Sequence, residues 1–89
     1  MAKRGKLDIT YDILKTIQKS NNLIKPTPLL RKSNTSTARF KEYLAELTAK
    51  NFVEKTNHKG ENFISLTNKG FKFLEKYSTI VNFIDEFEL

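Results

Sequence analysis

Apolar side chains recur with a helical period from Leu7 to about Ser20. On a helical wheel they fall within one arc, whereas the aspartates and lysines of the segment lie on the opposite side. The aspartates occupy the first turns and the lysines come later, which is the order that the helix dipole favours. The segment is therefore predicted to be an amphipathic helix with one buried face. The residues of its apolar arc are Leu7, Ile9, Ile13, Leu14 and Ile17.

Two shorter helices separated by a polar turn are predicted next. Thr27 stands at a helix N-cap position, and Pro28 follows it at the first helical position, where the N–H that proline lacks would have no helical partner. A short helix is thus expected over Pro28–Lys32. Residues 33–37 are polar and favour a turn and a cap, so a third helix is expected from about Ser36 to Lys50. Its expected core side chains are Phe40, Tyr43, Leu44 and Leu47.

The period changes from helical to alternating after Asn51, a residue that tolerates the left-handed conformation and is expected to end the third helix. Residues 52–56 and 62–66 contain β-branched and aromatic side chains, and the polar residues between them include a glycine. This pattern predicts a β-hairpin with a polar loop of four or five residues.

The last predicted helix is capped by Thr67 and continues without proline to Leu89. Its apolar positions are spaced four, three, four and three residues apart, as in a coiled-coil seam, and two more apolar residues widen the stripe. A helix of about 23 residues, with a rise of roughly 1.5 Å each, exceeds the body of so small a domain. We therefore expect its surplus to meet a second copy of the chain; the alternative is that the helix folds back over its own domain. The stripe consists of Phe73, Leu74, Tyr77, Ile80, Val81, Ile84 and Phe87.

The order of three helices, a hairpin and a last helix is typical of a winged helix. Two short helices joined by a polar turn form the helix-turn-helix, and the hairpin forms the wing. The predicted fold class is α+β, mostly α, with a C-terminal dimerisation helix. Residues 1–66 are expected to form the winged helix-turn-helix domain with a basic N-terminal arm, and residues 67–89 the dimerisation helix. A chain of 89 residues has a small core, so a partner that covers apolar surface would add stability.

The basic residues are concentrated in the first half of the chain. The formal net charge is +6; residues 1–41 carry ten basic side chains against two acidic ones, and the remaining residues carry six against eight. This asymmetry indicates a polyanion-binding half, and a solvated lysine-rich face is the alternative. No apolar run approaches the roughly 20 residues that span a bilayer, and the N-terminus does not have the pattern of a signal peptide. We therefore expect no membrane partner and a cytoplasmic protein, which is nucleoid-associated if its polyanion is DNA.

The chain contains several short motifs, namely Thr27-Pro28-Leu29-Leu30, Thr35-Ser36, Arg39-Phe40-Lys41-Glu42-Tyr43-Leu44, Asn51-Phe52-Val53-Glu54 and Leu66-Thr67-Asn68-Lys69-Gly70. Together they resemble an archaeal family of small winged-helix proteins, which includes dimeric, chromatin-associated DNA-binding proteins of about this size. The resemblance implies a homodimer that binds double-stranded DNA, as a transcriptional regulator or as a chromatin-like architectural protein. The chain differs from the family's usual pattern in having Asn51 where a glycine is common, and in the brevity of its last helix.

The second helix of a helix-turn-helix enters the major groove with its N-terminal part. The candidate base-reading residues are therefore Thr35, Ser36, Thr37, Arg39 and Lys41. The first helix of the motif, the N-terminal arm and the wing are expected to contact phosphates or a neighbouring groove, through Lys25, Arg31, Lys32, Lys3, Arg4, Lys6, Lys55, His58 and Lys59. A single arginine among several hydroxyls gives no strong signal of sequence discrimination, which leans slightly toward an architectural role.

The sequence shows no catalytic or metal-binding pattern. It has no cysteine and one histidine, His58, in the predicted hairpin loop, and its three glycines are too far apart to form a phosphate-binding loop. We therefore expect no enzymatic activity, no cofactor, no metal and no small-molecule substrate. The competing hypothesis is a winged-helix adaptor that binds a protein in a transcription or replication assembly. An RNA-binding role is disfavoured because no exposed aromatic platform is identified.

Overall fold

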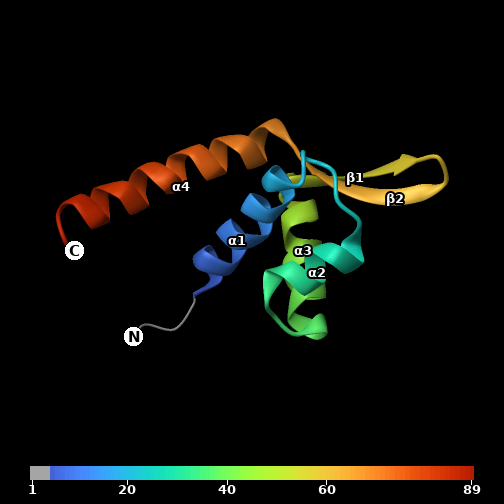
Figure 1. Ribbon diagram of the computed structural model, residues 1–89, viewed down its shortest axis with the longest axis horizontal. Helices are drawn as coiled ribbons and strands as arrows, with labels where there is room; N and C mark the ends of the chain where they lie inside the picture. The colour runs from blue at the N-terminus through green and yellow to red at the C-terminus, as the bar shows by residue number, and fades with distance from the viewer. Residues whose placement is uncertain (1–4) are drawn as a thin grey trace.

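The computed structural model describes residues 5–89, which form a mostly helical winged-helix fold (Figure 1). Its elements are α1 (Lys6–Lys19), α2 (Pro26–Ser33), α3 (Thr37–Ala49), β1 (Val53–His58), β2 (Glu61–Leu66) and α4 (Asn68–Glu86). Helices α1 to α3 form the body, from which the β1–β2 hairpin extends in one direction and α4 in the other (Figure 1). The molecule is therefore elongated, with extents of 48 × 26 × 21 Å. The predicted fold class, a mostly helical winged helix with a C-terminal helix, and the predicted order of elements are confirmed.

Helix α1 forms where the sequence predicts it, but its buried face begins later. Ile9, Ile13, Leu14 and Ile17 are buried, whereas Leu7 is 61% exposed because it lies in the first turn, beyond the edge of the core. Two asparagines in the left-handed conformation follow the helix and turn the chain toward α2.

The beginning of α2 differs from the prediction. The helix begins at Pro26, and its N-cap is Lys25, not Thr27. Pro26 takes the first position for the reason given above for Pro28, since a proline there forfeits no helical hydrogen bond. Helix α3 begins as predicted: Ser36 caps it, and its hydroxyl accepts a hydrogen bond from the Arg39 N–H at 3.2 Å. Asn51, with a φ of 64°, lies just beyond the end of α3, as expected.

The hairpin is longer and its turn tighter than the sequence predicts. The antiparallel ladder runs from Val53 opposite Leu66 to His58 opposite Glu61, which leaves a turn of Lys59 and Gly60 alone. Both turn residues have positive φ, at 53° and 80°, which is the geometry of the twisted two-residue turns that join antiparallel strands. The polar residues assigned to a loop therefore belong to the strands, because the ladder depends on backbone groups and not on side-chain polarity.

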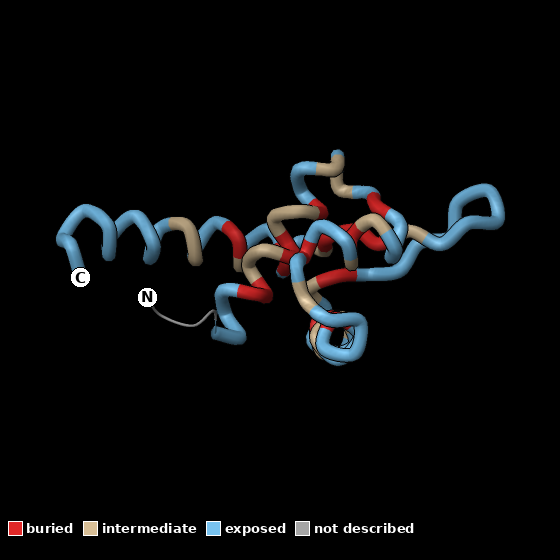
Figure 2. Tube along the Cα trace, turned by 60° about the horizontal axis from the view of Figure 1, so that its bottom comes forward, coloured by how far each residue is buried: buried red, intermediate tan, exposed pale blue. Residues whose placement is uncertain are grey.

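The core lies where the three body helices meet the base of the hairpin, as the burial colours of Figure 2 show. Ile24, between α1 and α2, pairs with Ile64 of β2 through two backbone hydrogen bonds of 3.1 and 2.8 Å, and this ties the linker to the sheet. The start of α4 is held close to the body at Gly70, where any Cβ would collide with the carbonyl oxygen of Phe52. The buried apolar residues are Ile9, Ile13, Leu14, Ile17, Ile24, Leu29, Phe40, Leu47, Val53, Ile64, Leu66 and Leu74.

The hairpin tip and the second half of α4 project from this core and are exposed along their length (Figure 2). Among residues 5–89, no helix combines the length and the apolar character needed to cross a membrane.

Candidate nucleic-acid interface

Helix α3 has one face in the core and the opposite face open to solvent. Phe40 and Leu47 are buried, and Tyr43 and Leu44 are half-buried, so the predicted core residues of this helix are confirmed. The opposite face exposes Ala38, Glu42, Ala45 and Ala49. Sequence reasoning missed these four residues, although a helical wheel centred on the buried side would have placed them together. The three alanine side chains leave room for a close approach of another surface to the helix backbone, and Glu42 is the one longer side chain among them.

The predicted reading residues occupy three different environments at the start of α3. The Ser36 hydroxyl caps the helix, and Thr35 before it is half-buried. Arg39 is exposed on the flank of α3 that faces the beginning of α1. Thr37 and Lys41 line the opposite flank, toward α2 and the hairpin.

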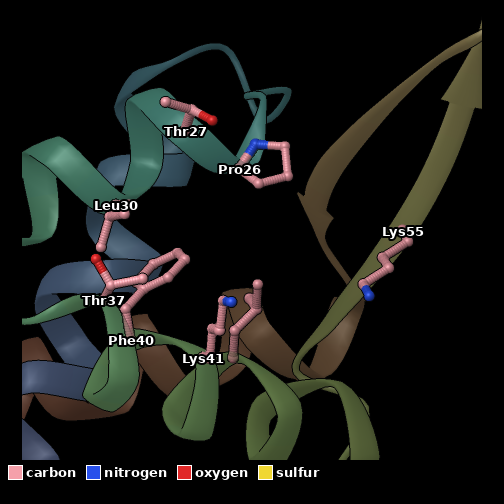
Figure 3. Close-up of a pocket in the computed structure, with 8 residues that line it drawn as sticks. Pro26, Thr27, Leu30, Thr37, Phe40, Lys41 and Lys55 are labelled. Carbon is pink, nitrogen blue, oxygen red and sulfur yellow. The ribbon is translucent and has the colours of Figure 1, made fainter.

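A hollow of about 290 Å³ lies between α2, α3 and β1 (Figure 3). Its floor is mostly apolar, and two lysines, Lys41 of α3 and Lys55 of β1, stand on the elements that flank it (Figure 3). The structure thus brings a predicted reading residue and a predicted wing residue to one site. Two ammonium groups beside α3 give this flank a positive charge.

Lys6 does not belong to an N-terminal arm, contrary to the prediction. It is the first residue of α1, and its ammonium group lies 2.7 Å from a carboxylate oxygen of Glu46 on α3. This hydrogen bond, together with the charge of Lys50 one turn along the helix, lowers the pKa of the Glu46 carboxyl. The two arm residues predicted alongside it, Lys3 and Arg4, lie outside the described residues.

Lys25 also has an acidic partner close by. Its ammonium group lies 2.8 Å from Glu61 at the start of β2 and stands over the ring of Phe63. A phosphate contact by Lys25 would have to compete with this carboxylate. The remaining predicted contacts, Arg31, Lys32, His58 and Lys59, are all exposed.

The structure adds two basic residues to the surface that the sequence predicts. Lys15 and Lys19 of α1 line a polar hollow together with Lys32 and the turn that precedes α3. Their sequence signal was the basic excess of residues 1–41, in which both are counted, but that count does not single them out as contacts.

The apolar stripe of α4 is divided between two environments. Leu74 is buried in the chain's own core, so it is not available to a partner, contrary to its place in the predicted dimerisation stripe. Phe73 and Tyr77 pack on the same body: the Phe73 ring lies 5.4 Å from that of Phe52, and the Tyr77 ring stacks 4.7 Å from that of Tyr11. The first half of the helix thus follows the alternative in which it covers its own domain. The second half exposes Ile80, Val81, Phe83, Ile84 and Phe87.

These features define a winged-helix protein. Its body has three helices, its β-hairpin forms the wing, and α3, the second helix of the helix-turn-helix, exposes its outer face. The sequence matches the family model described as winged helix-turn-helix over residues 3–85, and the chain belongs to this family. The search against curated protein sequences finds no significant match.

Several solved structures share this fold. Sso10a-2, a DNA-binding protein from Sulfolobus solfataricus, superposes with a TM-score of 0.79 at 15% identity, over 96% of this chain and 86% of that one. The oxidised form of MarR from E. coli gives a TM-score of 0.74 at 21% identity, over 84% of this chain and 54% of that one, so the chain spans about half of MarR. F-93 of SSV1 gives a TM-score of 0.65 at 26% identity, over 88% of this chain and 91% of that one.

Proposed function

We propose that this protein binds duplex DNA as a homodimer, with α3 in the major groove and the wing and basic N-terminal residues on the flanking backbone. In this role it is a transcriptional regulator or a chromatin-like architectural protein, and it catalyses no reaction. The observation that carries the proposal is the exposed, small-residue face of α3 with cationic side chains on its flanks. The description of Sso10a-2 as a DNA-binding protein supports the same class of ligand.

The size of the α3 face suits the major groove. That groove is about 12 Å wide and admits one α-helix. Ala38, Ala45 and Ala49 add little width to the exposed side of α3, so the helix backbone can approach the base edges. Lys41 and Lys55 on one flank, and Arg39 on the other, are then positioned for phosphates or bases at the groove edges.

Cationic side chains of α2, α3 and the hairpin are available for phosphate contacts. Six of them are exposed and form no ion pair within residues 5–89: Arg31, Lys32, Arg39, Lys41, Lys55 and Lys59. Each contact with a phosphate releases condensed counterions, so affinity depends on the number of such contacts and on salt concentration. Lys6 and Lys25 contribute less, because each would first have to leave its carboxylate.

A second copy of the chain is the proposed partner of the exposed half of α4. Five large apolar side chains from Ile80 to Phe87 lie on this half, where no other element of the described chain covers them. Ile80, Ile84 and Phe87 continue the heptad seam of the sequence, and Val81 and Phe83 flank this seam on its two sides. Pairing of two such helices would remove this surface from water, which is the main favourable term in protein association.

The proposal is tested by fluorescence anisotropy of a labelled random-sequence duplex, titrated with the protein at several salt concentrations. We expect micromolar or tighter binding at low salt, with an affinity that falls linearly in the logarithm of salt concentration. In an Arg39→Ala, Lys41→Ala variant, the affinity falls and the salt slope decreases by up to about 1 per lost phosphate contact. The matched control is Lys72→Ala, Lys76→Ala on α4, which removes the same charge away from α3 and leaves binding nearly unchanged.

No binding at low salt would contradict the proposal and favour the adaptor hypothesis. Equal losses in the α3 variant and in the α4 control would also contradict it, because the interaction would then reflect net charge and not the face of α3. Circular dichroism on each variant separates a loss of binding from a loss of fold.

A further inference from the structure

One acidic residue, Glu42, lies on the exposed face of α3. The other residues opposite the core are the three alanines, and Arg39 and Lys41 are exposed on the two flanks, so Glu42 is the one side chain between these flanks that extends beyond a methyl group. Glu42 is exposed, and its side chain forms no hydrogen bond or ion pair within residues 5–89. By contrast Glu46, one turn further on, is engaged by Lys6 and Lys50.

An unpaired carboxylate on this face is unfavourable for indiscriminate DNA binding. In the major groove it loses water, and it is repelled by the phosphates on both sides. Most base edges there offer it an acceptor: guanine presents N7 and O6, and thymine presents O4. The amino group of cytosine is a donor without an adjacent acceptor on the same base, so cytosine is the base that satisfies Glu42.

Arg39 provides the complementary group beside Glu42. The two residues are three positions apart on α3 and line the same hollow of about 270 Å³. A spacing of three residues corresponds to about 4.5 Å along a helix, close to the roughly 3.4 Å that separates neighbouring base pairs. The Arg39 guanidinium can donate two hydrogen bonds to guanine O6 and N7 while Glu42 accepts one from cytosine on the adjacent pair.

We propose that Glu42, together with Arg39, makes the protein selective for a half-site in which a cytosine and a guanine occupy neighbouring base pairs. The inference rests on the proposed binding of duplex DNA by α3. Glu42 acts as a specificity-determining residue: it weakens binding to random DNA, because it rejects sequences that place an acceptor opposite its carboxylate. The reading helix thus discriminates more strongly than its hydroxyl-rich start implies, which favours a regulator over an indiscriminate architectural protein.

The experiment is a selection of bound sequences from a randomised duplex library by the wild-type protein and by Glu42→Gln and Glu42→Ala. The wild type is expected to enrich a cytosine next to a guanine, and replacing that cytosine pair lowers its affinity by roughly 5- to 100-fold. Glu42→Gln is expected to prefer adenine at the same position, because a glutamine amide pairs with adenine N6 and N7. Glu42→Ala is expected to bind random duplex at least as tightly as the wild type, because the repelled carboxylate is gone, and to lose the preference. Glu75→Gln on α4 is the control for the loss of one negative charge, and it selects the wild-type sequence.

The random-duplex titration distinguishes the failure of this inference from that of the proposed function. If wild type and Glu42→Ala both bind random duplex but enrich the same base, or none, at this position, the inference is overturned and DNA binding stands. If the wild type binds no duplex at low salt, both are overturned. Because Glu42 is exposed, the variants should fold, and thermal unfolding by circular dichroism checks this.

Discussion

Tyr77 is the residue at which α4 leaves the body of the protein. Its ring lies between those of Tyr11 and Phe73, and its hydroxyl donates a hydrogen bond to the carboxylate of Asp8 on α1. This hydrogen bond is the main reason that the pKa of Tyr77 is raised from 10.0 to about 12, with burial and the negative charge of Asp8 contributing in the same direction. The contact therefore stabilises the protonated phenol and fixes the direction in which the exposed half of α4 projects.

The Tyr77→Phe variant should lose stability in a pH-dependent way. A folded-state pKa above the unfolded value means that the contribution is complete below about pH 10 and disappears as the pH rises toward 12. We expect a loss of about 0.5–1.5 kcal/mol at neutral pH, which shrinks over this interval. Urea unfolding of both proteins from pH 8 to 12 measures the difference. Tyr43→Phe is the control, since the Tyr43 hydroxyl has no hydrogen bond within the described residues; an equal pH trend there would refute the assignment.

Single residues also show where local sequence patterns stop being informative. Lys6 and Lys25 were predicted as DNA contacts because they are basic and lie near the motif, yet their carboxylate partners, Glu46 and Glu61, are 40 and 36 residues away in the chain. No local spacing indicates such pairs, because they form only when α1 packs beside α3 and when the linker joins the sheet. The exposed face of α3 could have been derived from the wheel, and Glu42 was missed because charge was counted over segments and not placed on faces.

At the scale of elements, periodicity predicted which segments fold, and backbone geometry decided where they end. Helices α1 and α3 follow from apolar arcs that the core buries, α2 follows from its prolines, and α4 follows from a stripe of which only the first half packs on the body. Asn51 and Ser36 end and begin α3 as their side chains suggest. The start of α2 was ambiguous because two prolines each satisfy the rule for a first helical turn. The hairpin turn was assigned too long because its polar residues pair through the backbone, and the positive φ of Lys59 cannot be inferred from a lysine.

Helix α4 consists of two halves with different partners, so substitutions in each should have different effects. Ile80→Lys, Ile84→Lys alters the exposed half, and we expect it to prevent dimerisation while the helical content of the body persists. Light scattering at micromolar concentration, with circular dichroism on the same samples, measures the oligomeric state and the helical content.

The matched control is Thr79→Lys, Asn82→Lys on the outer side of α4, which adds the same charge and should remain dimeric. A monomeric wild-type chain at this concentration would contradict the proposed dimer. Tyr77→Lys is a poor test, because Tyr77 packs on its own body.

At the scale of the whole molecule, the chain is elongated, and the proposed reading helix lies in the body while the proposed dimer contact lies in the projecting half of α4. A dimer would therefore present two separated DNA-binding surfaces. Binding of the second surface to the same duplex is then intramolecular, and such linkage raises affinity by roughly 10²- to 10⁴-fold where the geometry permits both contacts. We expect the wild type to gain affinity steeply when the duplex is lengthened from one half-site to two, spaced by one helical turn or a multiple of it. The Ile80→Lys, Ile84→Lys variant should bind both duplexes about equally once the number of sites is taken into account. Titrations of the two duplexes at a single salt concentration decide the matter: an equal gain in the monomeric variant would show that the two surfaces act independently and that the α4 contact contributes nothing to DNA binding.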